Sequence, residues 1–430
     1  MRTWVLFFGV LMSIECSAQF KNIKIADELN GFSPINSSIA INHKDSKNIV
    51  AAVSLNRSVY TLDGGTTWAE SKVPSVFGGG NPLVISDMKG HFYYFHQSDP
   101  GGKGKGNENW MDRVVLQKSD DGGATWGEEN FFGLNPSKNQ SHFTPSINAK
   151  KSILYSAWTQ FDQYGLDDAS CQSSILFSVS SNGSKWSKPL QLSQTPGDCM
   201  DGNKTAANAT AVVSLDGKMY AAWTLNEVIF FDRSYDGGDT WLSNDLAIGK
   251  QIGGWALSNI PGVKLSNSRP TLIIDTSPTR VMNSLYVAFA DQRNGANDTD
   301  IWFMRSVNRG DNWTSPFRIN SDGKGHHQFS PAIAVDASSA FIYVVYYDRR
   351  NYEDNQTDVY LSYSFDGGNV FYEKKISETP FTPTDTGSLG DVINIAASDG
   401  IITPIWSRMD DGKVSVWTTI IKVGDLSRGK

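Results

Sequence analysis

The chain has 430 residues and a formal net charge of −7, and 39% of its residues are hydrophobic. A net negative charge excludes a general affinity for nucleic acids and other polyanions, so an acidic ligand would have to meet a local cluster of basic side chains. A chain of this length usually folds as two or three domains, unless internal repeats join it into one.

The first residues predict a secretory signal peptide at residues 1–18. Arg2 precedes an apolar run (Trp4 to Ile14), and small residues follow at the expected cleavage site. The run is too short to span a membrane, and no second one follows. A lipid anchor on Cys16 is an alternative, which Glu15 disfavours because a small residue is wanted there. We expect export through the secretory pathway to a periplasmic, surface or extracellular location.

A short motif recurs along the rest of the chain. It reads Ser or Thr, a gap, Asp, a gap, Gly, two further residues and an aromatic ring. The acidic or amide position is occupied by Asp63, Asp121, Asn182, Asp236, Asn308 and Asp366, and the copy at Asn182 is contracted. Asp accepts hydrogen bonds from nearby backbone amides, and Gly supplies the positive φ of a tight turn. Each copy therefore predicts a turn between antiparallel strands.

The spacing of the closing aromatic residues predicts a ring of similar modules. The copies are about 60 residues apart, as expected for propeller blades. Six copies are visible, and three more strands are expected near residues 391–397, 402–406 and 414–421. A strand at Phe20–Ile25 would supply the missing outer strand and remove the exposed edges. We predict a single all-β domain at residues 19–430, a seven-bladed β-propeller, with six blades as the alternative.

The motif turns join the third and fourth strands of each module, so they should share one end of the ring. Long loops between second and third strands should lie at the other end, where variable loops on a rigid scaffold collect function. These loops span residues 98–112, 161–172, 291–300 and 348–358. Cys171 and Cys199 both fall at this end, and an oxidising compartment predicts a disulfide between them.

With these motifs, the chain resembles the Asp-box (BNR-repeat) β-propellers of the sialidase superfamily over essentially all of residues 19–430. The resemblance implies the architecture more than an activity, because catalytic and non-catalytic members share such turns. Sialidases carry an arginine triad, a tyrosine nucleophile with a glutamate, and an aspartic acid/base. Their first arginine lies in a Phe/Tyr-Arg-Ile-Pro motif, which is absent here. Arg57 lacks that context and Arg318 lies late in the chain, so the catalytic set is not transferred.

Several polar residues nevertheless indicate a ligand site at the loop-rich end. Residues just before the inner strands should face the central funnel, namely Asn81, His142, Arg269, Gln328 and Asp391. Arginine forks bind carboxylates, so Arg269, Arg293 and Arg349, with Asp291 and Asp348 beside them, predict a pocket for an anionic sugar. The alternative is that the pairs Asp291–Arg293 and Asp348–Arg350 only staple their loops.

Hydrolysis of a glycoside would need two groups with opposed protonation roles. The preferred acid/base is Asp391, and the preferred nucleophile or stabiliser is Tyr347, or Tyr346, beside Asp348. His142 with a tyrosine is a plausible pair for β-elimination of uronate polymers. The alternatives are a strand cap for Asp391, strand aromatics for the tyrosines and an ordinary loop residue for His142.

The sequence thus predicts an exported monomer that recognises an acidic glycan and acts as a sialidase-like exo-glycosidase. A non-catalytic glycan- or protein-binding propeller is the alternative, and a polysaccharide lyase is the third hypothesis. No cofactor is expected, and the net charge argues against nucleic acid. No metal is expected, because His326-His327 lacks cysteine or acidic residues at metal-binding spacing.

Overall fold

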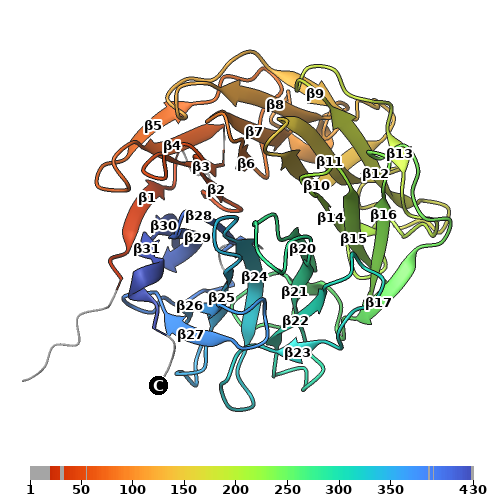
Figure 1. The fold of residues 1–430 in the computed structure, drawn as a ribbon. Coiled ribbons are helices and arrows are strands. Elements are labelled where there is room, and N and C mark those ends of the chain that lie inside the picture. Colours follow the sequence, from red (N-terminus) through yellow and green to blue (C-terminus); the bar gives the residue numbers. More distant parts are fainter. Residues whose placement is uncertain (1–19, 30–32, 55, 386–387, 391, 428–430) are drawn as a thin grey trace, which may run out of the picture.

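The computed structural model describes residues 20–29, 33–54, 56–385, 388–390 and 392–427. Seven small antiparallel sheets are arranged in a ring around a central axis (Figure 1). This confirms the all-β class and the seven-bladed propeller, and the six-bladed alternative is wrong. The expected signal peptide lies outside the described residues. Within the described ranges, no helix is long and apolar enough to cross a membrane.

The blades are numbered along the chain, and their strands run from the axis outward. Blades 1 to 3 contain β2 (Ser38–Ile41), β3 (Ile49–Val53), β4 (Arg57–Thr61) and β5 (Ala69–Lys72); β6 (Leu83–Ser86), β7 (Phe92–Gln97), β8 (Val114–Ser119) and β9 (Asn130–Phe132); and β10 (Asn139–Asn148), β11 (Ile153–Phe161), β12 (Ser173–Ser180) and β13 (Leu190–Gln191).

The next three blades repeat this four-stranded meander. Blades 4 to 6 contain β14 (Ala207–Val213), β15 (Met219–Leu225), β16 (Val228–Ser234) and β17 (Leu246–Lys250); β20 (Thr271–Ile274), β21 (Leu285–Asp291), β22 (Asp300–Ser306) and β23 (Phe317–Arg318); and β24 (Gln328–Val335), β25 (Ile342–Asp348), β26 (Asp358–Ser364) and β27 (Tyr372–Lys375). A small hairpin between blades 4 and 5 consists of β18 (Ala256–Leu257) and β19 (Ser266–Asn267).

Blade 7 closes the ring by joining the two ends of the chain. It contains β28 (Asn394–Ser398), β29 (Ile401–Asp410), β30 (Lys413–Thr418) and β1 (Ile23–Asp27), with β31 (Ile421–Lys422) also paired to β29. Strand β1 pairs antiparallel with β30, from Ile23 opposite Thr418 to Asp27 opposite Ser415. Figure 1 shows the red first strand beside the blue last ones. The predicted closure by an N-terminal strand is confirmed. The helical elements in the described residues are the short 3-10 turns η1 (Gly104–Gly106) and η2 (Val423–Asp425).

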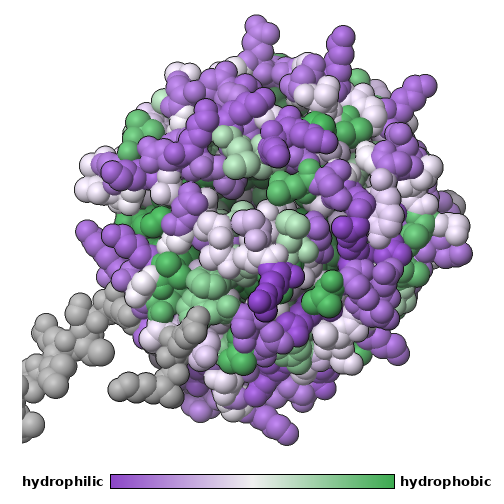
Figure 2. All heavy atoms as spheres, in the orientation of Figure 1, coloured by the Kyte–Doolittle hydropathy of each residue, from purple (hydrophilic) through white to green (hydrophobic). Residues whose placement is uncertain are grey.

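The core lies between neighbouring blades. All residues of the second strands β3, β7, β15, β21 and β25 are buried, whereas the outer strand β5 is largely exposed. A second strand is covered on both faces by the adjacent blades, which is why apolar residues predominate along it. On the surface seen in Figure 2, hydrophobic residues lie as separate spots among hydrophilic ones.

The repeated motif forms the same hydrogen-bonded turn in successive blades. In blade 2, the Ser119 hydroxyl donates to Asp121 (2.9 Å) and accepts from the Gly123 amide (2.9 Å). Asp121 also accepts from the Thr125 amide at 2.9 Å. Gly123 has a φ of 94°, and a Cβ there would lie 2.7 Å from Val50 of blade 1. The glycine therefore permits both the turn and the close approach of two blades.

Candidate binding site at the loop-rich end of the channel

The two ends of the propeller carry different structures. The motif turns connect third and fourth strands, and the long loops connect second and third strands, so in an antiparallel meander they lie at opposite ends. We call these the motif end and the loop-rich end. Long second-to-third-strand loops span residues 98–113, 162–172, 292–299 and 349–357. Asp121, Asp236 and Asp366 thus lie opposite Arg293 and Arg349.

A channel follows the axis of the ring. The first strand of every blade contributes to a cavity of about 350 Å³. Most of its wall is apolar: Ile39, Ile41, Val84, Ile85, Ile273, Ile333, Val335 and Ile395. The polar residues of the wall are His43, Ser86, Thr144, Thr210, Arg269, Thr271, Asn394 and Ser398. An apolar wall offers little to a charged or heavily hydroxylated ligand, so the polar chemistry must be sought at the channel's ends.

Polar side chains gather at the mouth of the channel at the loop-rich end. A second cavity of about 60 Å³ is lined by Asn36, Asn81, His142, Asn267 and Arg269, together with Pro82, Leu83, Phe143 and Val392. Arg269 lines both cavities, so it stands where the mouth meets the channel. The structure therefore brings together Asn81, His142 and Arg269 from the expected site, and it adds Asn36 and Asn267.

An unusual backbone conformation places several of these side chains. Asn36, Asn81 and His142 have positive φ angles of 55°, 49° and 47° near the start of their inner strands. Asn208 in blade 4 and Ser330 in blade 6 also have positive φ angles. The register of β10 shifts between Ser141 and Thr144, as at a bulge that contains His142. Bulges redirect side chains, and such strained residues concentrate at functional sites. A hydrogen bond of 3.0 Å from the Asn36 amide to Asn81 joins two blades across the mouth.

His142 is held by a carboxylate. Its Nε2 lies 2.6 Å from Asp201 Oδ1, and the Tyr164 hydroxyl donates to Asp201 Oδ2. The Trp255 ring meets His142 edge-on, with centroids 5.4 Å apart. Burial alone would raise the pKa of Asp201, but the His142 charge and the hydrogen bonds from His142 and Tyr164 hold this pKa below its usual value. The imidazole orientation is thus set by the Asp201 carboxylate.

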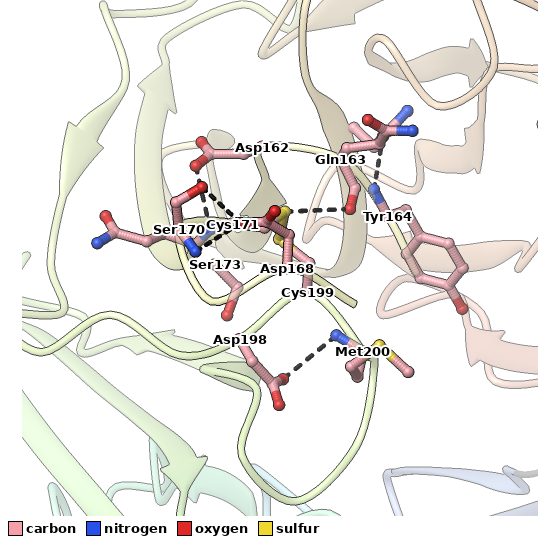
Figure 3. Close-up of a disulfide and its surroundings, with 12 residues drawn as sticks. Asp162, Gln163, Tyr164, Asp168, Ser170, Cys171, Ser173, Asp198, Cys199 and Met200 are labelled. Atoms are coloured by element: carbon pink, nitrogen blue, oxygen red, sulfur yellow. Dashed lines mark hydrogen bonds between the residues drawn. A yellow bond between two sulfur atoms is a disulfide. The ribbon is translucent and has the colours of Figure 1, made fainter. Parts of the chain in front are cut away.

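The Cys171–Cys199 disulfide holds the two loops that supply Asp201 and Tyr164. The predicted bridge is confirmed, with the Cα atoms 5.8 Å apart. In Figure 3 the backbone of Gln163 and Tyr164 lies beside it, and Cys171 Sγ is 3.5 Å from the Gln163 carbonyl oxygen. The Gly165 amide donates to the Cys199 carbonyl at 2.6 Å. Asp201 follows Cys199 by two residues, so the bridge restrains the backbone that carries the Asp201 carboxylate.

Arg293 and Arg349 do not join Arg269 at the mouth, which corrects the expected three-arginine pocket. Arg293 Nε lies 2.9 Å from both oxygens of the buried Asp291, and its guanidinium stacks 4.1 Å from the Trp302 ring centroid. Arg349 is 3% exposed and donates to Thr357 at 3.1 Å. Burial lowers the pKa of Arg349 to about 10. Both arginines hold their own loops together. For Arg293 this is the alternative in which Asp291 and Arg293 only staple their loop.

Asp348 and Gln328 belong to a buried network outside the mouth. Arg350 Nε donates to Asp348 at 2.8 Å, and Gln328 donates to the other Asp348 oxygen at 3.3 Å. Burial raises the pKa of Asp348 to about 6, against the opposing effect of Arg350. Gln328 has no exposed surface. The expectation that Gln328 faces the funnel is therefore wrong, because its amide is satisfied by Asn320 and Asp322 of the preceding crossover and by Asp348.

The candidate nucleophiles are also inaccessible. Tyr347 is 1% exposed, and its hydroxyl donates to the Ser407 carbonyl of blade 7 at 2.8 Å. Burial raises the pKa of Tyr347 well above its usual value. Tyr346 is fully buried and donates to Glu373 at 2.6 Å. Neither hydroxyl can meet a substrate. Asp391, the expected acid/base, lies outside the described residues.

Sequence reasoning missed several residues at or beside the mouth, namely Asn36, Asn267, Asp201, Tyr164 and Trp255. Asn36 was missed although it stands two positions before an inner strand, as the predicted Asn81 does. Asp201 follows Cys199 by two residues, which could have drawn attention to it once the disulfide was predicted. Tyr164 and Trp255 carry no comparable signal. In the described part of the chain, no group of three or more His, Cys, Asp or Glu side chains could hold a metal ion.

Comparisons with known proteins support the fold. No protein-family model and no curated protein sequence matches the chain. Among solved structures, a protein of unknown function from Dyadobacter fermentans is 12% identical with a TM-score of 0.50, and the match covers 93% of this chain and 99% of that one. An α-L-arabinofuranosidase from Fusarium graminearum is also 12% identical with a TM-score of 0.50, and the match covers 95% of this chain and 99% of that one. A Hadza microbial sialidase is 11% identical with a TM-score of 0.48, and the match covers 88% of this chain and 74% of that one. At 12% identity, the likeness to the first two structures shows a shared fold.

Proposed function

We propose that the protein is exported and binds an acidic glycan at the loop-rich mouth of its central channel. The observation that carries this proposal is the meeting of Arg269, His142 and the amides of Asn36, Asn81 and Asn267 around one cavity. In this proposal the repeated motif turns are Asp boxes, which shape the opposite end and take no part in binding.

The size and chemistry of the mouth favour an acidic sugar. A cavity of about 60 Å³ is far smaller than a typical ligand pocket, but it can admit a group such as a carboxylate. Arginine is suited to a carboxylate because its planar fork donates two parallel hydrogen bonds. We place the sugar carboxylate near Arg269 and the sugar ring above it, between the surrounding loops and the aromatic rings near His142.

Binding is better supported than hydrolysis. A glycosidase needs two carboxyl groups on either side of the scissile bond. The carboxylate that contacts His142 is Asp201, and His142 and Tyr164 already engage both of its oxygens. The α-L-arabinofuranosidase likeness bears on the architecture alone.

A lyase activity is a second candidate. Asp201 fixes the orientation of the His142 imidazole, as a carboxylate does for a histidine that acts as a general base. In β-elimination, His142 would take the C5 proton of a uronate. The electron pair left behind would form a C4–C5 double bond, the C4–O bond would break, and the departing oxygen would take a proton from solvent. Incubation with polygalacturonate tests this directly through the ultraviolet absorbance of the new double bond, and His142→Gln should abolish any signal.

A glycan array tests the binding proposal. The wild-type protein should retain acidic glycans and not their neutral counterparts, and Arg269→Gln should lower this binding at least about tenfold through loss of one charge-assisted contact. Arg280→Gln is the matched control, since Arg280 is an exposed residue of the same blade at the motif end. Equal binding by the two variants, or a preference for neutral glycans, would contradict the proposal.

A further inference from the structure

A second polar groove lies beside the mouth, between the long loops of blades 2 and 3. It has a volume of about 240 Å³, and its walls include Lys105, Trp110, Lys138, Asp162 and Tyr164. We infer that this groove is a second sugar subsite, which binds the neighbouring unit of a glycan whose acidic end occupies the mouth. The inference rests on the proposed function and extends it from a single sugar to a chain.

The groove presents an aromatic corner. The rings of Trp110 and Tyr164 are perpendicular, at 85°, with their centroids 5.3 Å apart. Both rings are partly exposed. Sugar rings have apolar C–H faces, and a large rigid aromatic surface buries such a face at a small cost in conformational entropy.

The corner is held rigidly by a residue that serves both loops. The Asn139 side chain donates to the Trp110 carbonyl at 2.8 Å and accepts from the Tyr164 amide at 2.9 Å. One amide therefore fixes the two backbones that carry the rings. A preorganised site loses little ordering entropy when a ligand binds, which distinguishes this corner from a chance surface hollow.

Polar groups around the corner, namely Lys105, Glu108, Lys138 and Asp162, offer hydrogen-bond donors and acceptors to the hydroxyls of a sugar. The Lys105 ammonium lies 5.0 Å from the Tyr164 ring centroid, and Lys138 pairs with Asp162 at 2.7 Å. Sugar pockets need a few convergent donors and acceptors on an aromatic wall, and these four residues supply both kinds. Lys105 is exposed and adds positive charge over the ring of Tyr164, whose hydroxyl reaches Asp201.

Tyr164 connects the groove to the mouth. Its ring forms a wall of the groove, and its hydroxyl donates to the carboxylate that holds His142. A chain that leaves the mouth over His142 would therefore reach the Trp110–Tyr164 corner next. This adjacency is why we assign the groove to the same glycan and not to an independent small molecule.

Calorimetric titration with short and longer probes tests the inference. The probes are galacturonic acid against tetragalacturonic acid, and sialic acid against sialyllactose. For at least one pair, the wild-type protein should bind the longer probe about tenfold or more tightly than the single sugar. Trp110→Ala should reduce this ratio to about two or less and leave the single-sugar affinity unchanged, because the lost contact lies outside the mouth.

Three further variants keep the result interpretable. Trp110→Phe retains an aromatic face and should recover most of the ratio. Lys105→Ala removes an exposed ammonium that lies over the Tyr164 ring, so it should lower the ratio for the acidic tetramer, and its melting temperature checks that the fold is kept. Tyr235→Ala, at an exposed aromatic residue of the motif end (52% exposed), is the matched control and should change nothing.

The outcomes separate the two proposals. If Arg269→Gln weakens single-sugar binding while Trp110→Ala and Lys105→Ala leave the length ratio intact, the groove is not a subsite and the mouth still binds. If the longer probes show no gain in the wild-type protein, the subsite is likewise overturned. If none of the four probes binds, the mouth proposal fails for these sugar classes and the subsite fails with it.

Discussion

Asp201 is the residue through which the disulfide loops act on His142. Its carboxylate lies 2.6 Å from the imidazole on one oxygen and accepts the Tyr164 hydroxyl on the other. Charge-assisted hydrogen bonds of this kind are stronger than neutral ones. The mouth therefore depends on a residue that does not line its cavity, and substitution there separates orientation from direct contact.

Asp201→Asn should destabilise the protein by about 2 kcal/mol at neutral pH, since hydrogen bonds to a charged group are lost. The pKa of Asp201 is lowered from 3.8 in the folded state, so its contribution is present above pH 3.8 and is lost as the pH falls below that value. Urea unfolding should show a gap between wild type and variant at pH 7 that narrows below pH 3.8. The exposed Asp167→Asn, from the adjoining loop, is the control, and a gap that persists in acid would contradict the assignment.

Asp232 shows the opposite behaviour. It is 1% exposed, and among the described residues its Oδ2 has no hydrogen-bond partner. Burial, with a contribution from Asp245, raises the pKa of Asp232 from 3.8 to about 6. The folded state therefore binds a proton more readily than the unfolded chain, and stability falls as the pH rises from about 4 to about 6.

Asp232→Asn removes the cost of this buried charge. The variant should be more stable than wild type at pH 7.5 by roughly 2 kcal/mol, and this advantage should shrink towards pH 4. Denaturant midpoints at the two pH values provide the measurement. A variant that is less stable than wild type at both would show that the Asp232 carboxylate is paired in solution.

The element that repeats most faithfully is the motif turn. In blade 1, Thr61 replaces the serine, and its hydroxyl donates to Asp63 (2.8 Å) and accepts from the Gly65 amide (3.0 Å). In blade 4, the Ser234 hydroxyl donates to Asp236 at 2.7 Å and accepts from the Gly238 amide at 2.9 Å. The same hydrogen bonds thus form with either hydroxyl, which predicts how the turn tolerates substitution.

Ser119→Ala should destabilise the protein by about 1–3 kcal/mol, because the buried Gly123 amide loses its acceptor. Ser119→Thr should be close to neutral, as the turn of blade 1 already uses threonine. Melting temperatures of the two variants give the comparison, and neither variant should alter glycan binding. Weaker glycan binding by a correctly folded Ser119→Ala protein would indicate that the ligand binds at the motif end, which contradicts our proposal.

Prediction from sequence succeeded where the information was local. Each motif copy contains its own hydrogen-bonding residues and its own glycines, so the turns, the repeat and the seven blades followed from the spacing. The position of Arg269 beside the channel followed from the same strand order. Arg293 and Arg349 were misjudged because spacing along a loop does not reveal side-chain direction, and nearby partners turned both away. Asp201 was missed because a long-range disulfide positions its loop.

At the scale of the whole molecule, closure of the ring determines stability. Ile25 and Ala26 of β1 pack in the core between blades 7 and 1, and the Thr419 hydroxyl donates to the Lys21 carbonyl at 2.8 Å. Without β1, the backbone groups of β30 would form an unpaired edge of the kind that promotes association.

A chain that begins after Asp27 should therefore be less stable than one that begins at Phe20. The loss should be about 5 kcal/mol, from one buried isoleucine and several backbone hydrogen bonds. Melting temperature and size-exclusion chromatography are the measurements, with earlier unfolding and added oligomers expected. Identical behaviour of the two chains would mean that β1 does not close the ring in solution.

The central claim is that ligand occupies the loop-rich mouth while the motif end stays free. Hydrogen–deuterium exchange, measured with and without the acidic oligosaccharide that the array identifies, tests it directly. We predict slower exchange around His142, Asp201 and Arg269, with no change in the turns at Asp121, Asp236 and Asp366. Protection of those turns, with the mouth segments unchanged, would contradict the account.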